Sequence, residues 1–349
     1  MEVHRLAVAG RDPVIARRVG GRVARVWLLR SRFADVAALA NATLTLGPDA
    51  GAFYDLGWAL SFTGQPRHAL ASYEQALRLY REVGDHGNEA ATLTNIGGVY
   101  EGLGGWQRAL TYFQQALPIT REVGYRAGEA TTLNNIGLVY NRLGDWQRAL
   151  AYYQQALPIQ REVGDRAGEA ATLNNIGRVY DGLGDRQQAL AYYQQALPIL
   201  REVGYRAGEA ITLNNIGGVY DGLGDREQAL PYFQQALPIQ REVGDRAGEA
   251  GTLNNIGAVY DGLGDWQRAL TCYQQALPIR REVGDRAGEA ITRYNIAMIH
   301  QAEGNLDRAI SELELVVDLD RQVGHPDLAA DTATLEEIRQ ERAETRKAT

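Results

Sequence analysis

The chain has 349 residues, of which 45% are hydrophobic and 23% charged, a composition that argues against disorder. The net charge of −7 argues against a nucleic-acid partner, because nucleic-acid binders usually display a basic surface. No apolar run approaches the roughly 18 residues of a membrane span, so we expect a cytoplasmic protein with no membrane partner. The only cysteine, Cys272, cannot form an internal disulfide or a zinc cluster, and we expect no metal or other cofactor.

Residues 1–49 are rich in arginine, but Glu2 and Asp12 fit a solvated helix better than an organelle-targeting peptide. Residues 14–30 and 32–48 predict two helices. Together they resemble a degenerate copy of the repeat that follows, so we treat 1–49 as an N-terminal segment.

Residues 50–324 repeat with a period of 40 residues over seven units, each of which predicts two helices and two glycine-marked turns. In the fourth unit Leu173, Ile176, Gly177 and Tyr180 fall on one face of the first helix. Glycine at the centre of this face lets the partner helix approach closely. Because one helix pair cannot cover both of its apolar faces, the pairs must stack into an all-α solenoid without strands.

The second helix of the same unit predicts an answering stripe of Ala189, Tyr193, Ala196 and Leu197, with Asp185 capping its start. A proline recurs inside this helix, where it either kinks the helix or ends it. The pattern continues to a glycine C-cap such as Gly164, which favours the kink. The prolines are Pro118, Pro158, Pro198, Pro238 and Pro278.

The units resemble the tetratricopeptide pattern W-x2-L-G-x2-Y followed by A-x3-F. Here the match runs through Leu133, Ile136, Gly137 and Tyr140, then through Ala149-x3-Tyr153. The longer period is most similar to the repeat domains of kinesin light chains, LGN/Pins adaptors and bacterial signalling ATPases. The resemblance implies a right-handed superhelix of antiparallel helix pairs that binds a peptide in its concave groove. Leucine replaces the leading tryptophan and the unit is longer than the usual 34 residues, so the pitch of the superhelix does not carry over.

Three rows of first-helix residues are expected to line that groove, since they lie beside the packing stripe. Amide side chains in the first row can pair with a peptide backbone, and acidic residues in the third favour a basic partner. The alternative is that these polar residues only keep the groove solvated. The candidate binding residues are Asn134, Asn174, Asn214 and Asn254; Leu138 and Arg178; and Asn141, Asp181, Asp221 and Asp261.

Other recurring residues favour structural roles. A second asparagine row, which includes Asn95, Asn175 and Asn255, never changes and predicts hydrogen bonds between repeats. Trp106, Trp146 and Trp266 exchange with arginine in other units, which indicates partly exposed packing. The pairs Arg126/Glu129, Arg166/Glu169 and Arg206/Glu209 are predicted to be surface ion pairs of little energetic value.

Residues 325–349 predict a polar helix, Asp327–Lys347, that caps the last repeat. Near-identical repeats spread like groups along a surface, whereas catalysis needs unlike groups at one place, so we expect no enzyme. We expect a scaffold or adaptor for a protein or peptide. One alternative is a sensor array of a signalling ATPase. A second is a self-assembling solenoid, because the sequence leaves homo-oligomers open.

Overall fold

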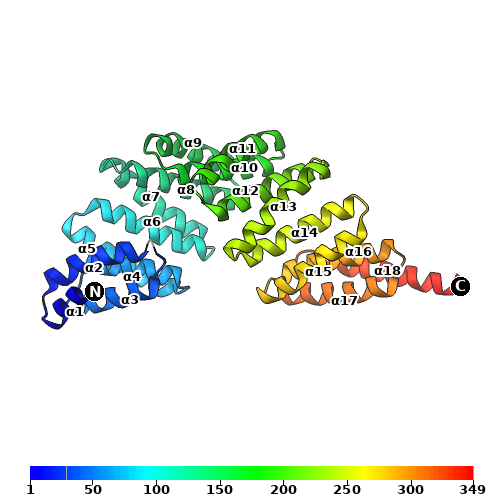
Figure 1. Cartoon of the computed structure of the whole chain (residues 1–349), viewed down its shortest axis with the longest axis horizontal. Helices are drawn as coiled ribbons and strands as arrows, with labels where there is room; N and C mark the ends of the chain where they lie inside the picture. Colours follow the sequence, from blue (N-terminus) through cyan, green and yellow to red (C-terminus); the bar gives the residue numbers. More distant parts are fainter. Residues whose placement is uncertain (29, 349) are drawn as a thin grey trace. The chain divides into compact units, whose positions relative to one another are not determined.

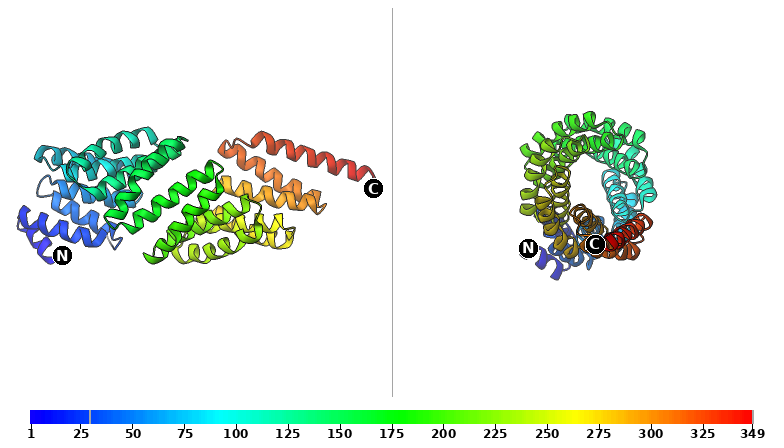
Figure 2. Two further views of the ribbon diagram at one scale, coloured as in Figure 1. Left: turned by 90° about the horizontal axis from the view of Figure 1, so that it is seen from above. Right: turned by 90° about the vertical axis from the view of Figure 1, so that its right-hand side faces the viewer.

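The computed structural model describes residues 1–28 and 30–348, which form α-helices and, over those ranges, no strand (Figure 1). The chain divides into two compact units, residues 1–175 and the residues from 176 onward, and each is described by itself. In each unit consecutive helices run antiparallel and pack side by side (Figure 2). The prediction of an all-α stack of helix pairs is therefore confirmed.

The helices of the first unit follow the predicted repeat closely. They are α1 (Glu2–Ala9), α2 (Pro13–Leu28), α3 (Phe33–Leu44), α4 (Ala50–Phe62), α5 (Pro66–Val83), α6 (His86–Gly102), α7 (Trp106–Glu122), α8 (Arg126–Arg142) and α9 (Trp146–Glu162). The boundary between the units falls within α10 (Arg166–Gly182). The second unit continues with α11 (Arg186–Glu202), α12 (Arg206–Gly222), α13 (Arg226–Val243), α14 (Arg246–Gly262), α15 (Trp266–Glu282), α16 (Arg286–Ala302), α17 (Leu306–Val323) and α18 (Leu328–Ala348).

The turns between paired helices contain a glycine in a left-handed conformation, and before α9, α11, α13 and α15 an aspartate follows it and caps the second helix. After α8, Gly144 adopts φ +77°, a left-handed conformation that ends the helix at little cost only for glycine. Asp145 then caps α9 by accepting a hydrogen bond from the backbone N–H of Arg148 at 3.1 Å. Asp185 does the same for α11 through Gln188, as predicted.

A glycine in the first helices α4, α6, α8, α10, α12 and α14 makes room for an aromatic ring of the second helix, whereas α16 carries Ala297 at this place. A Cβ atom on Gly137 would lie 2.6 Å from the ring of Tyr153, which is fully buried. A Cβ on Gly217 would lie 2.8 Å from the ring of Phe233. The close approach predicted for Gly177 is thus confirmed in its sister units, and it sets the spacing of each helix pair.

The recurring prolines lie inside helices that continue past them. α9 runs through Pro158 to Glu162, and α11 runs through Pro198 to Glu202. Gly164 follows α9 with φ +71°, the expected C-terminal position. The alternative that the second helix ends before the proline is therefore wrong.

The ends of the chain carry helices at the expected places. α2 and α3 match the helices predicted over 14–30 and 32–48, and α1 precedes them. His4 of α1 is buried, and its Nε2 lies 2.9 Å from the hydroxyl of Thr43 in α3. The division into segments 1–49, 50–324 and 325–349 stays a prediction.

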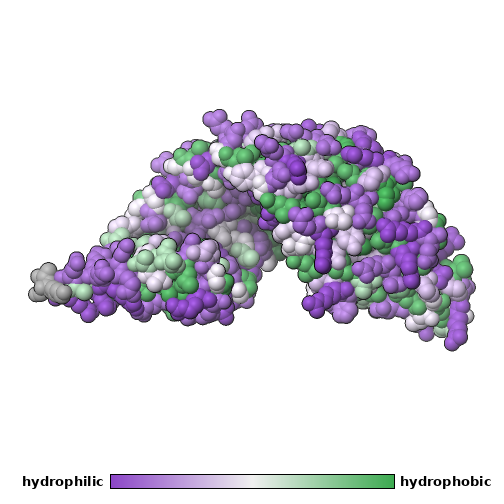
Figure 3. Space-filling model, turned by 180° about the vertical axis from the view of Figure 1, so that it is seen from behind, coloured by the Kyte–Doolittle hydropathy of each residue, from purple (hydrophilic) through white to green (hydrophobic). Residues whose placement is uncertain are grey.

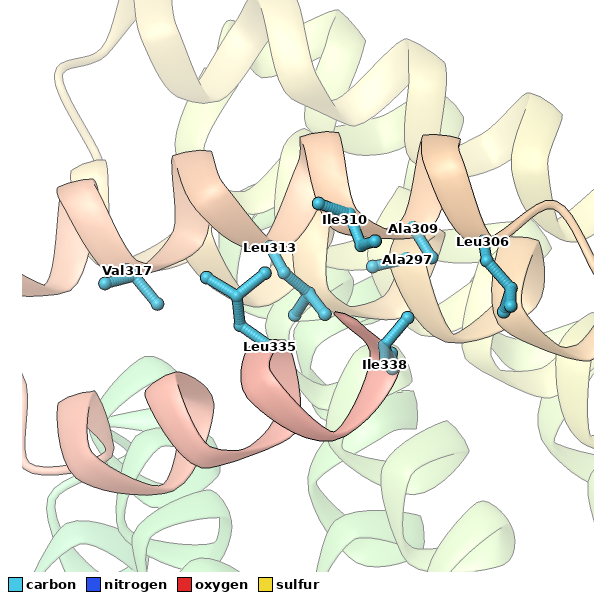
Figure 4. Close-up of a cluster of buried hydrophobic side chains, with 8 residues drawn as sticks. All are labelled: Ala297, Leu306, Ala309, Ile310, Leu313, Val317, Leu335 and Ile338. Atoms are coloured by element: carbon cyan, nitrogen blue, oxygen red, sulfur yellow. The ribbon is translucent and has the colours of Figure 1, made fainter. Parts of the chain in front are cut away.

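α18 covers the apolar side of α17 at the C-terminal end. Figure 4 shows Leu335 and Ile338 of α18 pointing toward Leu313 of α17, and all three are buried. On the face shown in Figure 3, hydrophilic residues gather over this C-terminal helix. Such a polar outer surface suits a helix that shields the last repeat from water.

The arginine and glutamate pairs at the start of α8, α10, α12 and α14 differ from the prediction. The Glu209 side chain is buried and accepts a hydrogen bond from Arg206 in its own helix. It accepts a second one, 2.8 Å long, from Nε of Arg201 in the preceding helix α11. Arg206 also reaches Glu242 of α13 at 2.8 Å. The prediction of surface ion pairs is therefore wrong for the glutamate, which is buried and joins α11 to α12, while Arg206 extends the network to α13. Glu129 and Glu249 have the same arrangement.

Candidate functional site

The first asparagine row, predicted to bind a peptide, also takes part in the packing of repeats. Oδ1 of Asn134 on α8 accepts a hydrogen bond from the hydroxyl of Thr172 on α10 at 2.9 Å. In the second unit Asn214 accepts one from Thr252 at 2.9 Å, and Asn254 accepts one from Thr292 at 3.0 Å. Asn174 likewise has a partner within the chain. The amide oxygens of this row are therefore used by the fold, which leaves the Nδ2 groups of Asn134, Asn214 and Asn254 without a hydrogen bond to any described residue.

The second asparagine row makes the hydrogen bonds between repeats that the sequence predicted. Asn175 donates from Nδ2 to Oδ1 of Asn134, and Asn255 donates in the same way to Asn214, both at 3.3 Å. Asn95 donates to the hydroxyl of Tyr54 at 2.9 Å. Asn95, Asn175 and Asn255 thus each link their first helix to the one before it.

Two members of this second row, Asn135 and Asn295, make no hydrogen bond to the preceding repeat among the described residues, and for Asn135 the acceptor itself is missing. Thr94 stands where the acceptor of Asn135 would be, and its hydroxyl instead pairs with the hydroxyl of Thr132 at 3.2 Å. The amide of Asn135 consequently makes no hydrogen bond with any described residue. It is half-buried on α8 and faces open space beside α6.

The middle and acidic rows are unequal in their exposure. Leu138 and Arg178 are half-buried, and Nε and Nη2 of Arg178 are shielded from solvent without a hydrogen bond to a described residue. Burial raises the pKa of Asp181, an effect that the charge of Arg186 opposes. Burial likewise raises the pKa of Asp261 against the charge of Arg226.

An arginine also stands close to Asp221, since its Oδ1 lies 3.8 Å from Nε of Arg226. The second helices therefore place cations beside the acidic row, which weakens the attraction that this row would exert on a basic peptide. Asn141, the first-unit member of the row, is half-buried and uncharged.

An open pocket of about 530 Å³ lies in the first unit along the same rows. It is lined from α6 by Thr94 and Gly98, and from α8 by Thr131 and Asn135. We call the side of the first helices that carries these positions the first-helix face. The rest of the lining is mostly apolar and includes Trp58, Phe62, Pro66, Tyr73, Val99 and Leu103.

Sequence reasoning missed the contribution of α4 to this pocket. The predicted rows begin with Thr94 and Gly98. The residues 40 positions before them are Tyr54 and Trp58, which therefore belong to the first and middle rows. The exact 40-residue spacing could have identified both residues. Phe62 comes from the end of the same helix and is 64% exposed.

The remaining candidates for chemistry are accounted for by packing. Cys272 packs beside Phe233 and Val259, and burial raises the pKa of its thiol, which disfavours the nucleophilic thiolate. Arg142 lies over the ring of Trp106 at 5.9 Å, in line with the predicted packing role of this tryptophan row. Among the described residues no three His, Cys, Asp or Glu side chains are grouped to hold a metal. Nor is any described helix long and apolar enough to span a membrane.

The stacked helix pairs, their central glycines and the shared first-helix face define an α-solenoid of the helical-repeat class. The tetratricopeptide repeat model matches residues 50–83, 69–122, 128–202, 208–282 and 248–322. These matches cover most of the chain, which therefore belongs to the tetratricopeptide repeat family. The fold of this family is a non-catalytic protein-interaction fold.

Several solved structures share this fold at low sequence identity. The apo quorum sensor NprR of B. thuringiensis is 18% identical over 87% of each chain, with a TM-score of 0.72. A signal transduction ATPase with a tetratricopeptide repeat sensor from Pyrococcus horikoshii is 16% identical, with a TM-score of 0.72 over 93% of this chain and 50% of that one. A Rap protein complexed with competence and sporulation factor is 15% identical, with a TM-score of 0.59 over 98% of this chain and 96% of that one. No curated protein matches the sequence.

Proposed function

We propose that this protein is an interaction scaffold that binds an extended segment of another polypeptide along its first-helix face. The observation that carries the proposal is the open pocket on this face, in which the row that varies most between repeats meets amides and apolar side chains. Amides with unused donors can pair with the backbone of an extended chain, whatever its sequence. The variable row, which runs Gly98, Leu138, Arg178, Gly218, Ala258 and Met298, would then select among side chains.

The similar structures support this proposal by analogy of fold. NprR is described as a quorum sensor, and the Rap protein is in complex with a factor, so two solenoids with this fold respond to or hold a partner. The predicted binding residues Asn134, Asn174, Asn214 and Asn254 remain candidates through their amide groups. The basic character that the acidic row predicts for the partner has weaker support, because arginines stand beside Asp221 and Asp261.

Selection of random peptides against the full chain tests this function. Twelve-residue peptides displayed on phage should be enriched, and a charge placed on the first-helix face by Ala171→Glu or Ile211→Glu should weaken the selected binders. Both residues are exposed in the row of Thr131. The matched control is Gln194→Glu, which adds the same charge at an exposed position of a second helix. Equal weakening by the control, or no enrichment, would show the proposal to be wrong.

A second candidate function is a sensor array that regulates a signalling ATPase. It rests on the similarity of 93% of this chain to part of such an ATPase, of which it covers half. Here the partner segment would belong to, or control, a nucleotide-hydrolysing domain. Purification of the protein from its native cells followed by an ATP hydrolysis assay tests this role, and material without any such activity argues against it.

A further inference from the structure

The pocket in the first unit differs from the rest of the first-helix face in having no charged side chain among its described lining residues. We propose that it holds one aromatic side chain of the bound segment and is the anchor point for that segment. This inference rests on the proposed function, because it assigns the kind of residue that the groove would recognise in this unit.

Large apolar side chains form one wall of the pocket and are held in place by their neighbours. Trp58 packs edge-on against Tyr54, with ring centroids 6.0 Å apart. Phe62 stacks on Phe33 at 4.8 Å and still exposes most of its surface. Leu103, directly after the end of α6, also lines the pocket and is half exposed. Fixed aromatic rings offer both faces and edges to an incoming ring, which favours an aromatic occupant over a flexible aliphatic one.

Glycines create the space between these walls. Gly98 stands in the row that carries Trp58, Leu138 and Arg178 in neighbouring units, and a Cβ atom there would meet nothing within 4 Å. The same is true of Gly102, one turn further along α6. Neither glycine is required by packing, and any larger side chain at these positions would project into the pocket. The volume of about 530 Å³ is within the usual range of ligand pockets.

The absence of charged side chains in the lining disfavours a basic or acidic side chain in the pocket. A charged side chain that entered this pocket would lose hydration without meeting an opposite charge, which is costly. The acidic rows of the second unit offer carboxylates such as Asp221, but the described lining of the pocket has none. Charge complementarity therefore assigns an uncharged anchor to the first unit.

The side-chain amide of Asn135, which has no hydrogen bond to a described residue, can bond with the backbone of the bound segment next to its aromatic residue. Its copies Asn95, Asn175 and Asn255 donate to the preceding repeat, whereas Thr94 has removed the acceptor at this point. The Asn135 side chain lines the pocket and can both donate to and accept from a peptide group. A backbone contact beside an apolar anchor is how an extended peptide gains both affinity and register.

Filling the pocket from within the protein tests the inference. Gly98→Leu places a side chain in the open space, and it should preserve folding because leucine favours helix more than glycine does. Gln194→Leu is the matched control, since it adds the same side chain at an exposed position of the second helix α11, away from the first-helix face. Peptides selected against the natural full-length chain should each contain an aromatic residue. They should bind Gly98→Leu about tenfold or more weakly and bind Gln194→Leu nearly unchanged.

Circular dichroism and urea denaturation of both variants establish that each keeps the fold. Aromatic peptides whose binding is lost only in Gly98→Leu support the anchor. Peptides that bind the first-helix face but tolerate Gly98→Leu, or that carry basic residues and no aromatic one, overturn the anchor and leave the proposed function standing. Failure to enrich any peptide that the charge variants weaken overturns both.

Discussion

Two adjacent glycines in α12 differ in their surroundings: one faces a buried ring and the other faces open space. Substitutions at the two positions therefore distinguish the effect of packing from the effect of helix propensity. Gly217 faces the ring of Phe233, where a Cβ would lie at 2.8 Å, whereas a Cβ on Gly218 would meet nothing. We expect Gly217→Ala to lower the free energy of unfolding by about 1 to 3 kcal/mol, because the ring must move. Gly218→Ala should raise it by up to about 1 kcal/mol, because alanine favours helix.

Urea denaturation of the two variants, followed by circular dichroism, measures both effects. The pair controls for position, since both substitutions lie in the middle of the same helix. If Gly217→Ala proved as stable as Gly218→Ala, the close approach of the ring would not be what fixes glycine at this position.

Single residues also show where sequence reasoning succeeded and where it stopped. The stripe around Gly177 was predictable, because helical spacing decides which residues share a face. The use of Asn134 Oδ1 by Thr172 was not, since it depends on which of two adjacent asparagines points at the next repeat. The pocket could not be predicted from the sequence for the same reason. The exposed ring of Phe62 lines it together with residues of α6 only because α4 and α6 pack against each other.

At the scale of helices, a buried glutamate in each first helix from α6 to α16 joins that helix to the one before it. Glu209 accepts from Arg201 of α11 and from Arg206 of its own helix, and it is buried. Glu209→Ala should therefore destabilise the protein by about 1 to 3 kcal/mol, because two guanidinium groups lose their shared acceptor.

Glu242→Ala is the matched control for this change. Glu242 pairs with the same Arg206 but is 57% exposed, so its loss should change the free energy of unfolding by less than about 1 kcal/mol. Thermal and urea denaturation compare the two. Equal effects would mean that the pairing is a surface feature after all, as the spacing of the charges along the sequence predicts.

The docking of α18 on α17 should depend on pH through a pair of carboxyl groups. Burial raises the pKa of Asp331 on α18 to about 6, and the hydrogen bond and charge of Asp320 on α17 act in the same direction. Asp327 adds to this shift, and His325 opposes it. Because the pKa in the docked state exceeds the ordinary value of about 3.9, the docked state favours the protonated form. Its stability is then fully present below about pH 4 and declines as the pH rises to about 6.

Asp331→Asn should remove this dependence. Above about pH 6 the amides of α18 should exchange with deuterium more slowly in the variant than in the natural chain, and below about pH 4 the difference should vanish. Comparison at equal pH cancels the intrinsic exchange rate. Glu337→Gln, which neutralises an exposed carboxyl on the same helix, serves as the control and should have little effect. A constant difference between Asp331→Asn and the natural chain at every pH would rule out the titration.

At the scale of the whole molecule, the period of 40 residues predicted more than any single motif. The period alone identifies the helix pairs, the caps and the packing stripe, because repeated units must make repeated contacts. It could not identify what distinguishes one unit from another. The pocket beside Asn135 arises where Thr94 and Gly98 depart from the repeat, and a departure has meaning only once its neighbours in space are known.

Removal of one whole period should preserve the fold, whereas removal of half a period should not. Deletion of residues 206–245 joins Tyr205 to Arg246, so that Arg201 would face Glu249 in place of Glu209. The two glutamates make equivalent hydrogen bonds, at 2.7 Å from Arg241 to Glu249 and 2.8 Å from Arg201 to Glu209. The shortened chain should keep its helical content per residue and melt cooperatively at a lower temperature, since one repeat and one interface are lost.

Deletion of residues 206–225 removes α12 alone and is the matched test of the alternative. It brings two second helices together, so that Phe233 of α13 loses Gly217, the glycine that accommodates its ring. We expect loss of cooperative melting and aggregation, measured by circular dichroism and light scattering. If both deletions failed alike, stability would not be a sum of nearest-neighbour terms; if both survived, the pairing of first and second helices would not be what holds the solenoid together.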